Sequence, residues 1–205
     1  MEKNLDLRIQ KTYMALTEAL WSMMCEMPFE NIRVQDLCDR AMIRKSTFYK
    51  HFADKYELLA FVVREKIEQF NAQLIPSGSQ ESPVTYYFHC VDCLFGFLSS
   101  NEQLISRSVK SNSLMLVLDE LSRQILPDLQ RHLAEDEKNG YKLPASPAVM
   151  AGFFAGAVSE VTRRWLISGK KMEEAELRAQ LKTLINAVYR AENEAFLCST
   201  ERQGE

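Results

Sequence analysis

The sequence predicts an all-α fold of about nine helices, in which a small N-terminal helix-turn-helix head precedes a larger helical region. The 205 residues include only 7 Gly and 6 Pro, and the stretch 29–75 contains neither. A β-sandwich or barrel needs a turn about every 8–12 residues, and Gly or Pro usually marks it. Apolar residues instead recur at the spacing of a helix face, as Leu16, Leu20 and Met23 do. These observations exclude an all-β protein and favour long helices.

Four helices are expected in the first part of the chain, over residues 8–27, 34–41, 44–51 and 55–73. Pro28 ends the first of them, because the residue before a proline disfavours the helical conformation. Asp54 is suited to cap the fourth helix, and Glu57 three residues later completes a pair that resembles a capping box. The helices are short before residue 55 and long after it, which predicts a head domain over 1–54 and a second domain over 55–205.

Five more helices are expected over residues 83–98, 101–110, 112–138, 147–168 and 173–197. Ser82-Pro83 and Ser146-Pro147 each place a capping residue before a proline at the first helical position, which is a typical helix start. Pro127 predicts a kink inside the third of these helices.

The composition is that of a globular protein without a membrane span. Apolar residues make up 46% of the chain and charged residues 26%, and no apolar run approaches the ~20 residues of a membrane helix. Residues 1–6 lack the apolar stretch of a secretion signal, and five cysteines fit reduced thiols, so we expect a cytoplasmic protein. A net charge of −3 argues against a general polyanion binder but leaves room for a local basic surface.

One segment concentrates positive charge. Residues 40–52 contain Arg40, Arg44, Lys45, Lys50 and His51 but no Asp or Glu. Short helices over 34–41 and 44–51, with a short turn between them, predict a helix-turn-helix. The second of these helices would turn two phenylalanines inward and polar residues outward, as a DNA-recognition helix does. The alternative is an ordinary solvated helix face with a few lysines.

The same segment resembles the DNA-binding region of TetR-family transcriptional regulators. The resemblance lies in residues 32–59, above all in Ser-Thr-Phe-Tyr-Lys-His-Phe at 46–52, followed by Lys55 and Leu58-Leu59. A weaker likeness at Trp165-Leu-Ile-Ser-Gly resembles regulators of dihydroxyacetone-kinase operons. The chain departs from the family pattern at Arg33 and Arg44, where capping residues are common, and at Met42, where glycine is common in the turn. Met42 implies either a turn without positive φ or a mildly strained one.

The resemblance implies that the helix over 44–51 enters the major groove of DNA. We expect Lys45 and Ser46 to contact base edges, and Arg44 to reach a guanine or a phosphate. Phosphate contacts are expected from Lys55 at the start of the next helix, from Gln35, and from the rest of the recognition helix. These last residues are Thr47, Tyr49, Lys50 and His51. For Tyr49 the alternative is packing against the first helix.

A single helix-turn-helix makes too few contacts for tight binding, so a homodimer is expected to place two recognition helices ~34 Å apart on a palindromic operator. The last two helices carry small and apolar residues suited to a four-helix bundle between subunits. The expected interface residues are Phe153, Gly156, Ala157, Val161, Trp165, Leu181, Leu184 and Val188. The alternative is that these residues form the core of a single chain, because composition does not separate core from interface.

The resemblance also implies a small-molecule effector bound among the later helices. Candidate residues share aromatic, thiol or apolar character: Phe61, Tyr86, Tyr87, His89, Cys90, Cys93, Phe97, Met115 and Leu118. Each has plain core packing as its alternative. Cys90 and Cys93 lie on one helix face, where a metal or redox role is conceivable, but no second Cys/His pair accompanies them. We therefore expect no metal and no cofactor.

No Gly-rich phosphate loop, G-x-S-x-G or H-E-x-x-H motif occurs in the sequence, which predicts a protein that is not an enzyme. The expected function is a TetR-like regulator of transcription, and specifically a repressor. One alternative is a TetR-like coactivator that works through a protein partner. Another is a helical ligand-binding protein or enzyme with a vestigial head.

Overall fold

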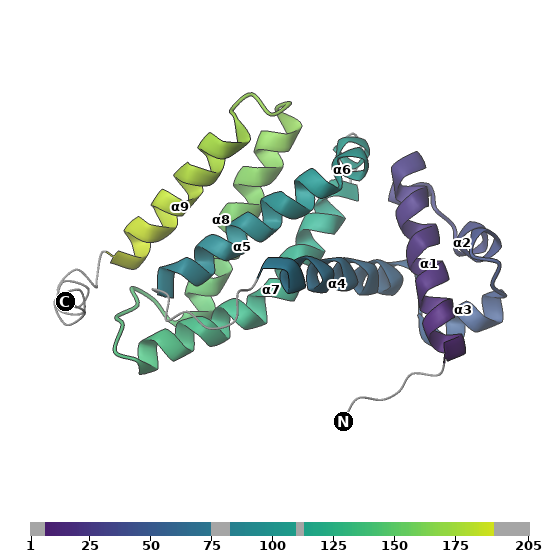
Figure 1. Cartoon of the computed structure of the whole chain (residues 1–205), viewed down its shortest axis with the longest axis horizontal. Helices are drawn as coiled ribbons and strands as arrows, with labels where there is room; N and C mark the ends of the chain where they lie inside the picture. The colour runs from purple at the N-terminus through teal and green to yellow at the C-terminus, as the bar shows by residue number, and fades with distance from the viewer. Residues whose placement is uncertain (1–6, 75–82, 110–112, 191–205) are drawn as a thin grey trace. The chain divides into compact units, whose positions relative to one another are not determined.

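The computed structural model describes residues 7–74, 83–109 and 113–190 (Figure 1). Within these ranges the chain forms nine α-helices, one short 3₁₀ helix and no strand, which confirms the predicted all-α class. Among the described helices, none combines the length and the apolar character that crossing a membrane requires.

The helices are α1 (Leu7–Glu26), η1 (Phe29–Asn31), α2 (Val34–Arg40), α3 (Lys45–His51), α4 (Lys55–Leu74), α5 (Pro83–Ser100), α6 (Glu102–Ser108), α7 (Ser113–Lys138), α8 (Pro147–Ile167) and α9 (Glu174–Arg190). The predicted helices agree in number and order. Helix α7 continues through Pro127. The predicted extension of the last helix to residue 197 lies outside the described residues.

The start of α4 is capped by the predicted pair of acidic residues, Asp54 and Glu57. One carboxylate oxygen of Asp54 accepts hydrogen bonds from the backbone N–H groups of Tyr56 at 2.8 Å and of Glu57 at 2.9 Å. The Glu57 carboxylate reaches back and accepts from the N–H of Ala53. These bonds satisfy donors that a helix start leaves without partners, and they fix where α4 begins.

The chain divides into two compact units. The first comprises Met1–Gln69 and Ser100–Glu120, and the second comprises Phe70–Ser99 and Leu121–Glu205. The first unit thus contains α1 to α3 and most of α4, together with α6 and the start of α7. The predicted domain border at residues 54/55 falls inside this unit and stays a prediction.

In the first unit, α1 packs against α2 and α6, and α2 packs against α3. The turn η1 contacts the start of α7, because the buried Ser113 hydroxyl accepts a hydrogen bond from the Phe29 N–H at 3.0 Å. The same hydroxyl donates to the Glu30 carboxylate at 3.1 Å. A segment about 80 residues further along the chain therefore supports the turn that precedes the helix-turn-helix.

In the second unit, α5, α8 and α9 lie side by side (Figure 1), and the last part of α7 joins them. The Tyr87 hydroxyl of α5 donates to the buried Asp136 carboxylate of α7 at 2.7 Å. The rings of Phe95 on α5 and Trp165 on α8 have their centroids 5.7 Å apart. Aromatic packing and a buried hydrogen bond thus hold α5 at the centre of this unit.

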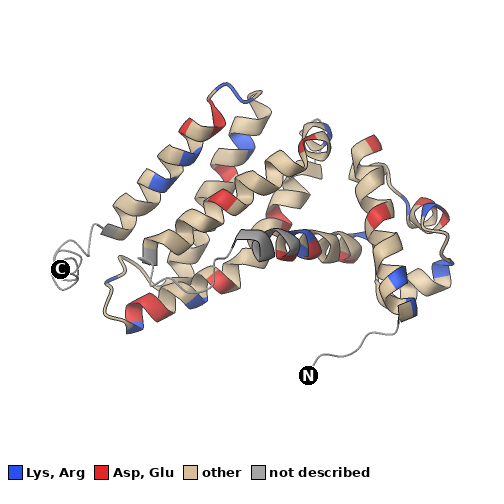
Figure 2. Ribbon diagram, in the orientation of Figure 1, with Lys and Arg blue, Asp and Glu red and all other residues tan. Residues whose placement is uncertain are grey.

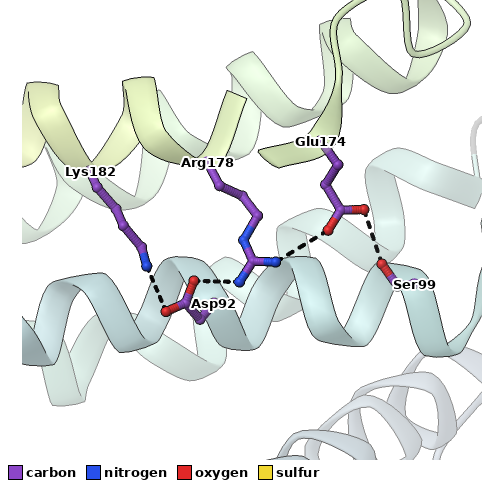
Figure 3. Close-up of polar contacts among 5 residues, drawn as sticks. All are labelled: Asp92, Ser99, Glu174, Arg178 and Lys182. Atoms are coloured by element: carbon purple, nitrogen blue, oxygen red, sulfur yellow. Dashed lines mark hydrogen bonds and ion pairs between the residues drawn. The ribbon is translucent and has the colours of Figure 1, made fainter. Parts of the chain in front are cut away.

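Charged groups join α5 to α9 (Figure 3). The Asp92 carboxylate accepts hydrogen bonds from Arg178 at 2.6 Å and from Lys182 at 2.7 Å. Arg178 also contacts Glu174 at 3.4 Å, and Glu174 in turn accepts from the Ser99 hydroxyl at 3.1 Å. Burial raises the pKa of Asp92, but its two cationic partners outweigh burial, and the pKa lies below its ordinary value.

Candidate nucleic-acid interface

Helix α3 is anchored by the aromatic side chains on its inner face. Phe48 is fully buried, and Phe52 directly after the helix is nearly so. The Phe52 ring packs on Tyr13 of α1 at 5.5 Å between centroids and on Phe61 of α4 at 5.6 Å. The predicted inward residues therefore fix α3 against two longer helices, which leaves its opposite face outward.

Helix α3 carries basic residues and no acidic residue (Figure 2). The exposed residues on the outer face of α3 and at its N-cap are Arg44, Lys45, Ser46, Tyr49 and Lys50. The helix has no acidic residue in its sequence, and among the described residues the side chains of Arg44, Lys45 and Lys50 form no ion pair or hydrogen bond. A group of exposed cations without acidic partners is the electrostatic surface that a phosphate backbone attracts.

Arg40 differs from these cations although it belongs to the same basic segment. Its guanidinium donates to both carboxylate oxygens of Glu26, at 2.6 and 2.7 Å, and to the Ser22 hydroxyl at 2.8 Å. The hydrogen bonds and charge of Arg40 also hold the pKa of Glu26 below its ordinary value. Arg40 therefore ties α2 to α1.

Lys55 lies at the start of α4, as expected, but its ammonium group points to the backbone of η1. It donates hydrogen bonds to the carbonyl oxygens of Phe29 at 2.9 Å, Glu30 at 3.0 Å and Ile32 at 2.9 Å. It also lies 4.7 Å from the centroid of the Phe29 ring. Burial lowers its pKa, which the nearby Glu30 partly offsets. All three N–H donors have protein acceptors, so a phosphate would have to displace a carbonyl.

The side chains of the remaining predicted DNA-contact residues are partly buried or already contact other residues of the chain. The His51 ring packs edge-on against Tyr13, with centroids 5.2 Å apart, and is half-buried. The amide of Gln35 donates to the Asp39 carboxylate at 2.6 Å on the exposed side of α2. Thr47 is half-buried, whereas Tyr49 is 55% exposed and its ring contacts Phe48 of its own helix.

The sequence leaves open whether the turn between α2 and α3 has a positive φ at Met42, and the structure has this strained form. Met42 has φ 54°, in the left-handed region that favours glycine. Neither Arg33 nor Arg44 makes a side-chain capping bond, as their residue types predict. The backbone N–H of Arg33 donates to the Asp36 carboxylate at 3.3 Å, so the start of α2 keeps one capping bond.

Arg33 is a candidate that sequence reasoning noted only as a missing cap. Its side chain is exposed directly before α2, beside Gln35. In helix-turn-helix proteins the first helix of the motif crosses the phosphate backbone. A basic residue at the start of that helix is the sequence feature that would have identified Arg33 as a candidate for a phosphate contact.

Comparisons with known proteins agree with this architecture. No protein-family model matches the chain. The HTH-type transcriptional regulator YxbF of Bacillus subtilis, itself uncharacterised, is 34% identical over 79 residues. That match covers 38% of this chain and only 21% of YxbF.

Solved structures match along most of the chain. A protein from Syntrophomonas wolfei assigned to the TetR family of transcriptional regulators matches with a TM-score of 0.65 at 13% identity, over 88% of this chain and 95% of that chain. The chain has the TetR-family fold. FadR of Bacillus subtilis, in complex with stearoyl-CoA, matches with a TM-score of 0.60 at 18% identity, over 86% of this chain and 97% of its own. The dihydroxyacetone kinase operon activator DhaS matches with a TM-score of 0.54 at 18% identity, over 88% and 97%.

The nine candidate effector residues are divided between the two units. Phe61, Met115 and Leu118 belong to the first unit, and the other six belong to the second. Within the second unit, the Tyr86 ring stacks on His132 with centroids 3.6 Å apart. Tyr87 and Phe97 are buried, while His89, Cys90 and Cys93 are half-buried.

The two thiols of α5 are not activated. Burial raises the pKa of Cys90 to about 12, and burial together with Asp92 raises that of Cys93. Because the thiolate is the nucleophile and the metal ligand, a raised pKa opposes both roles. Among the described residues, no group of three His, Cys, Asp or Glu side chains is placed to hold a metal ion.

The predicted dimer residues separate into an exposed and a buried set. Trp165 is 7% exposed and Leu181 is 4% exposed, so both pack inside their own chain. The Trp165 indole N–H also donates to the Met172 carbonyl at 2.7 Å. The exposed set is Phe153, Gly156, Ala157, Val161 and Leu184. Val188 is half-buried.

Proposed function

We propose that this protein is a TetR-like transcription regulator that binds a palindromic DNA operator as a homodimer and acts as a repressor. The observation that carries the proposal is the outer face of α3, where Arg44, Lys45 and Lys50 are exposed and have no acidic partner among the residues that the structure describes. The TetR-family fold supports it, because a fold built around a helix-turn-helix presents its second helix to the major groove.

The contacts of α3 with DNA follow from the position of each side chain. Lys45 and Ser46, in the first turn, would contact base edges, and Arg44 would reach a guanine or a phosphate. Tyr49 and Lys50, with Thr47 and His51, would contact phosphates and set the register. Gln35 and Arg33 would contact phosphates at the start of α2. Lys55 would support the turn η1 instead of binding DNA directly, because its donors are already satisfied.

The homodimer would form through the exposed face of α8 and α9. Phe153 is 55% exposed and Leu184 is 62% exposed in the single chain, and Gly152, Gly156 and Ala157 on α8 are exposed too. A Cβ atom added at Gly152 or Gly156 meets no atom within 4 Å, so this surface has room for a closely packed helix of a second copy. Burying such apolar side chains is the main favourable term in association.

The effector would be a small, largely apolar molecule bound among the helices of the second unit. Supporting observations are the aromatic and thiol side chains of α5, notably Tyr86 and Cys90, and the stearoyl-CoA bound to the TetR-fold protein FadR. Binding would release the operator only if the effector prefers one spacing of the two heads over the other.

One observation favours the alternative of a coactivator that acts through a protein partner. The loop after Trp165 belongs to the segment that resembles dihydroxyacetone-kinase operon regulators, and DhaS, a fold neighbour, is named as an activator. A coactivator would bind the operator weakly alone and strongly with its partner. A repressor would bind it strongly alone.

A gel-shift titration on the DNA upstream of the protein's own gene tests the proposal. The proteins compared are the wild type, the double variant Lys45→Ala/Lys50→Ala, and the control Lys171→Ala, which removes an exposed lysine from the loop between α8 and α9. We expect a shift that survives competitor DNA for the wild type and the control, and no shift for the double variant. If the double variant binds like the wild type, α3 is not the DNA-binding surface.

A further inference from the structure

The residue that closes α2 is unusual for its backbone conformation. The N–H of Ile43 donates to the Cys38 carbonyl at 2.8 Å, and the N–H of Met42 donates to the Asp39 carbonyl at 3.2 Å. This pair of bonds defines a helix ending whose first residue beyond the cap is left-handed and is usually glycine. Met42 occupies that position with φ 54°.

The same protein closes two other helices with the same pair of bonds and uses glycine both times. At the end of α7, Gly140 has φ 96° and donates to the Glu137 carbonyl at 3.1 Å, while Tyr141 donates to the Asp136 carbonyl. At the end of α8, Gly169 has φ 81° and occupies the equivalent position. The helix-turn-helix alone among these three endings carries a side chain there.

Packing does not explain the methionine. Met42 is 92% exposed, so its side chain gains almost nothing from the core. Lys170 is the other described non-glycine residue with a positive φ, 56°, and its ammonium lies 5.7 Å from the Trp165 ring centroid. A non-glycine residue in the left-handed region costs free energy, and such residues cluster at functional sites.

The position of Met42 indicates what it would bind. It lies two residues before Arg44, the N-cap of α3, and in helix-turn-helix proteins the first residues of the recognition helix contact base edges. The apolar group that base pairs present in the major groove is the C5 methyl of thymine. We propose that Met42 is a specificity-determining residue, whose side chain contacts the methyl group of a thymine at the edge of each half-site. The inference rests on the proposed function.

The test replaces each thymine of the operator, one at a time, by deoxyuridine, which lacks only the C5 methyl. Affinities are compared for the wild type, Met42→Ala and Met42→Gly on the operator fragment found by the gel-shift titration. For the wild type we expect one thymine per half-site at which loss of the methyl weakens binding about fourfold, the effect of exposing one methyl-sized group. Both variants should bind the thymine and deoxyuridine operators equally well.

The outcomes separate this inference from the proposed function. If the wild type binds no fragment specifically, the proposed function fails and the inference fails with it. If the wild type binds but Met42→Ala keeps the full thymine preference, or weakens thymine and deoxyuridine operators equally, the thymine contact is wrong while the regulator proposal stands. Alanine has a Cβ atom, so Met42→Ala restricts the backbone of the turn as methionine does, whereas Met42→Gly does not. If both variants lose the thymine preference, a looser turn is not the cause.

Discussion

Basic residues around the helix-turn-helix fall into two groups by what surrounds them. Lys45 and Lys50 are exposed and have no acidic partner in the described part of the chain, whereas Arg40 and Lys55 donate to acceptors of the protein itself. Charge alone therefore does not identify a DNA contact in this chain. The first pair would act on DNA, and the second pair would hold α2, α4 and η1 in place.

Lys55→Ala separates these two roles. The substitution removes three hydrogen bonds from a charged donor to backbone carbonyls, and we expect it to lower the free energy of unfolding by about 2 kcal/mol. Lys50→Ala, at an exposed position, should change it by less than about 0.5 kcal/mol. Urea denaturation of both variants measures the difference. An unchanged stability of Lys55→Ala, with weaker DNA binding, would instead restore the phosphate role expected from the sequence.

Met42→Gly tests the strain in the turn independently of DNA. Glycine relieves the left-handed conformation, so we expect a gain of about 1 kcal/mol in the free energy of unfolding. Gly169→Ala is the matched control: the added Cβ meets no atom within 4 Å, and only the backbone is strained, so we expect a loss of similar size. A melting temperature of Met42→Gly below that of the wild type would contradict the strain at this position.

Sequence reasoning found the polar residues of α3 but not the role of Lys55. The motif places Lys55 at the start of a helix, and a lysine there is well suited to a phosphate. Its acceptors are carbonyls 23 to 26 residues earlier in the chain, and the conformation of η1 directs them to it. A pattern of side-chain types carries no information on where backbone carbonyls point.

At the scale of elements, helix starts were predictable because local chemistry sets them. Ser146-Pro147 and the Asp54–Glu57 box mark the starts of α8 and α4 to within a residue. The faces of α8 and α9 were only partly predictable. Trp165 and Leu181 have the same apolar character as Phe153 and Leu184, yet the first two are buried and the last two are exposed; Trp165 packs on Phe95 of α5.

The tie between α5 and α9 makes a prediction about pH. The pKa of Asp92 is lowered in the folded chain, so its carboxylate stabilises the fold above the unfolded pKa of about 4 and loses this effect as pH falls through the folded pKa. Asp92→Asn should lower the free energy of unfolding by about 1–2 kcal/mol at pH 7 and by progressively less below pH ~4.

Asp128→Asn is the matched control, because Asp128 pairs with Arg131 in an exposed ion pair at 2.8 Å on α7. In urea denaturation at several pH values, Asp128→Asn should lower the free energy of unfolding by less than about 0.5 kcal/mol at any pH. If the cost of Asp92→Asn is the same at pH 7 and pH 3, the ion pairs with Arg178 and Lys182 do not stabilise the contact between α5 and α9.

At the scale of the whole molecule, the account requires two copies of the chain. Gly156→Leu adds a side chain to the exposed face of α8 without meeting other atoms near its Cβ, so the single chain should fold normally. We expect dimerisation to weaken at least tenfold in sedimentation equilibrium. Gln130→Leu, at an exposed position of α7, should leave it unchanged. If the wild type is a monomer, the proposed dimer interface is wrong.

The most direct test of the central claim is the salt dependence of operator affinity, measured by fluorescence anisotropy for the wild type, Lys50→Ala and Lys171→Ala. Each neutralised phosphate contributes roughly 0.9 to the slope of log affinity against log salt. Our account predicts that Lys50→Ala lowers the slope by about one per half-site and that Lys171→Ala leaves it unchanged. Equal slopes for all three proteins would contradict the claim that the exposed face of α3 binds the DNA backbone.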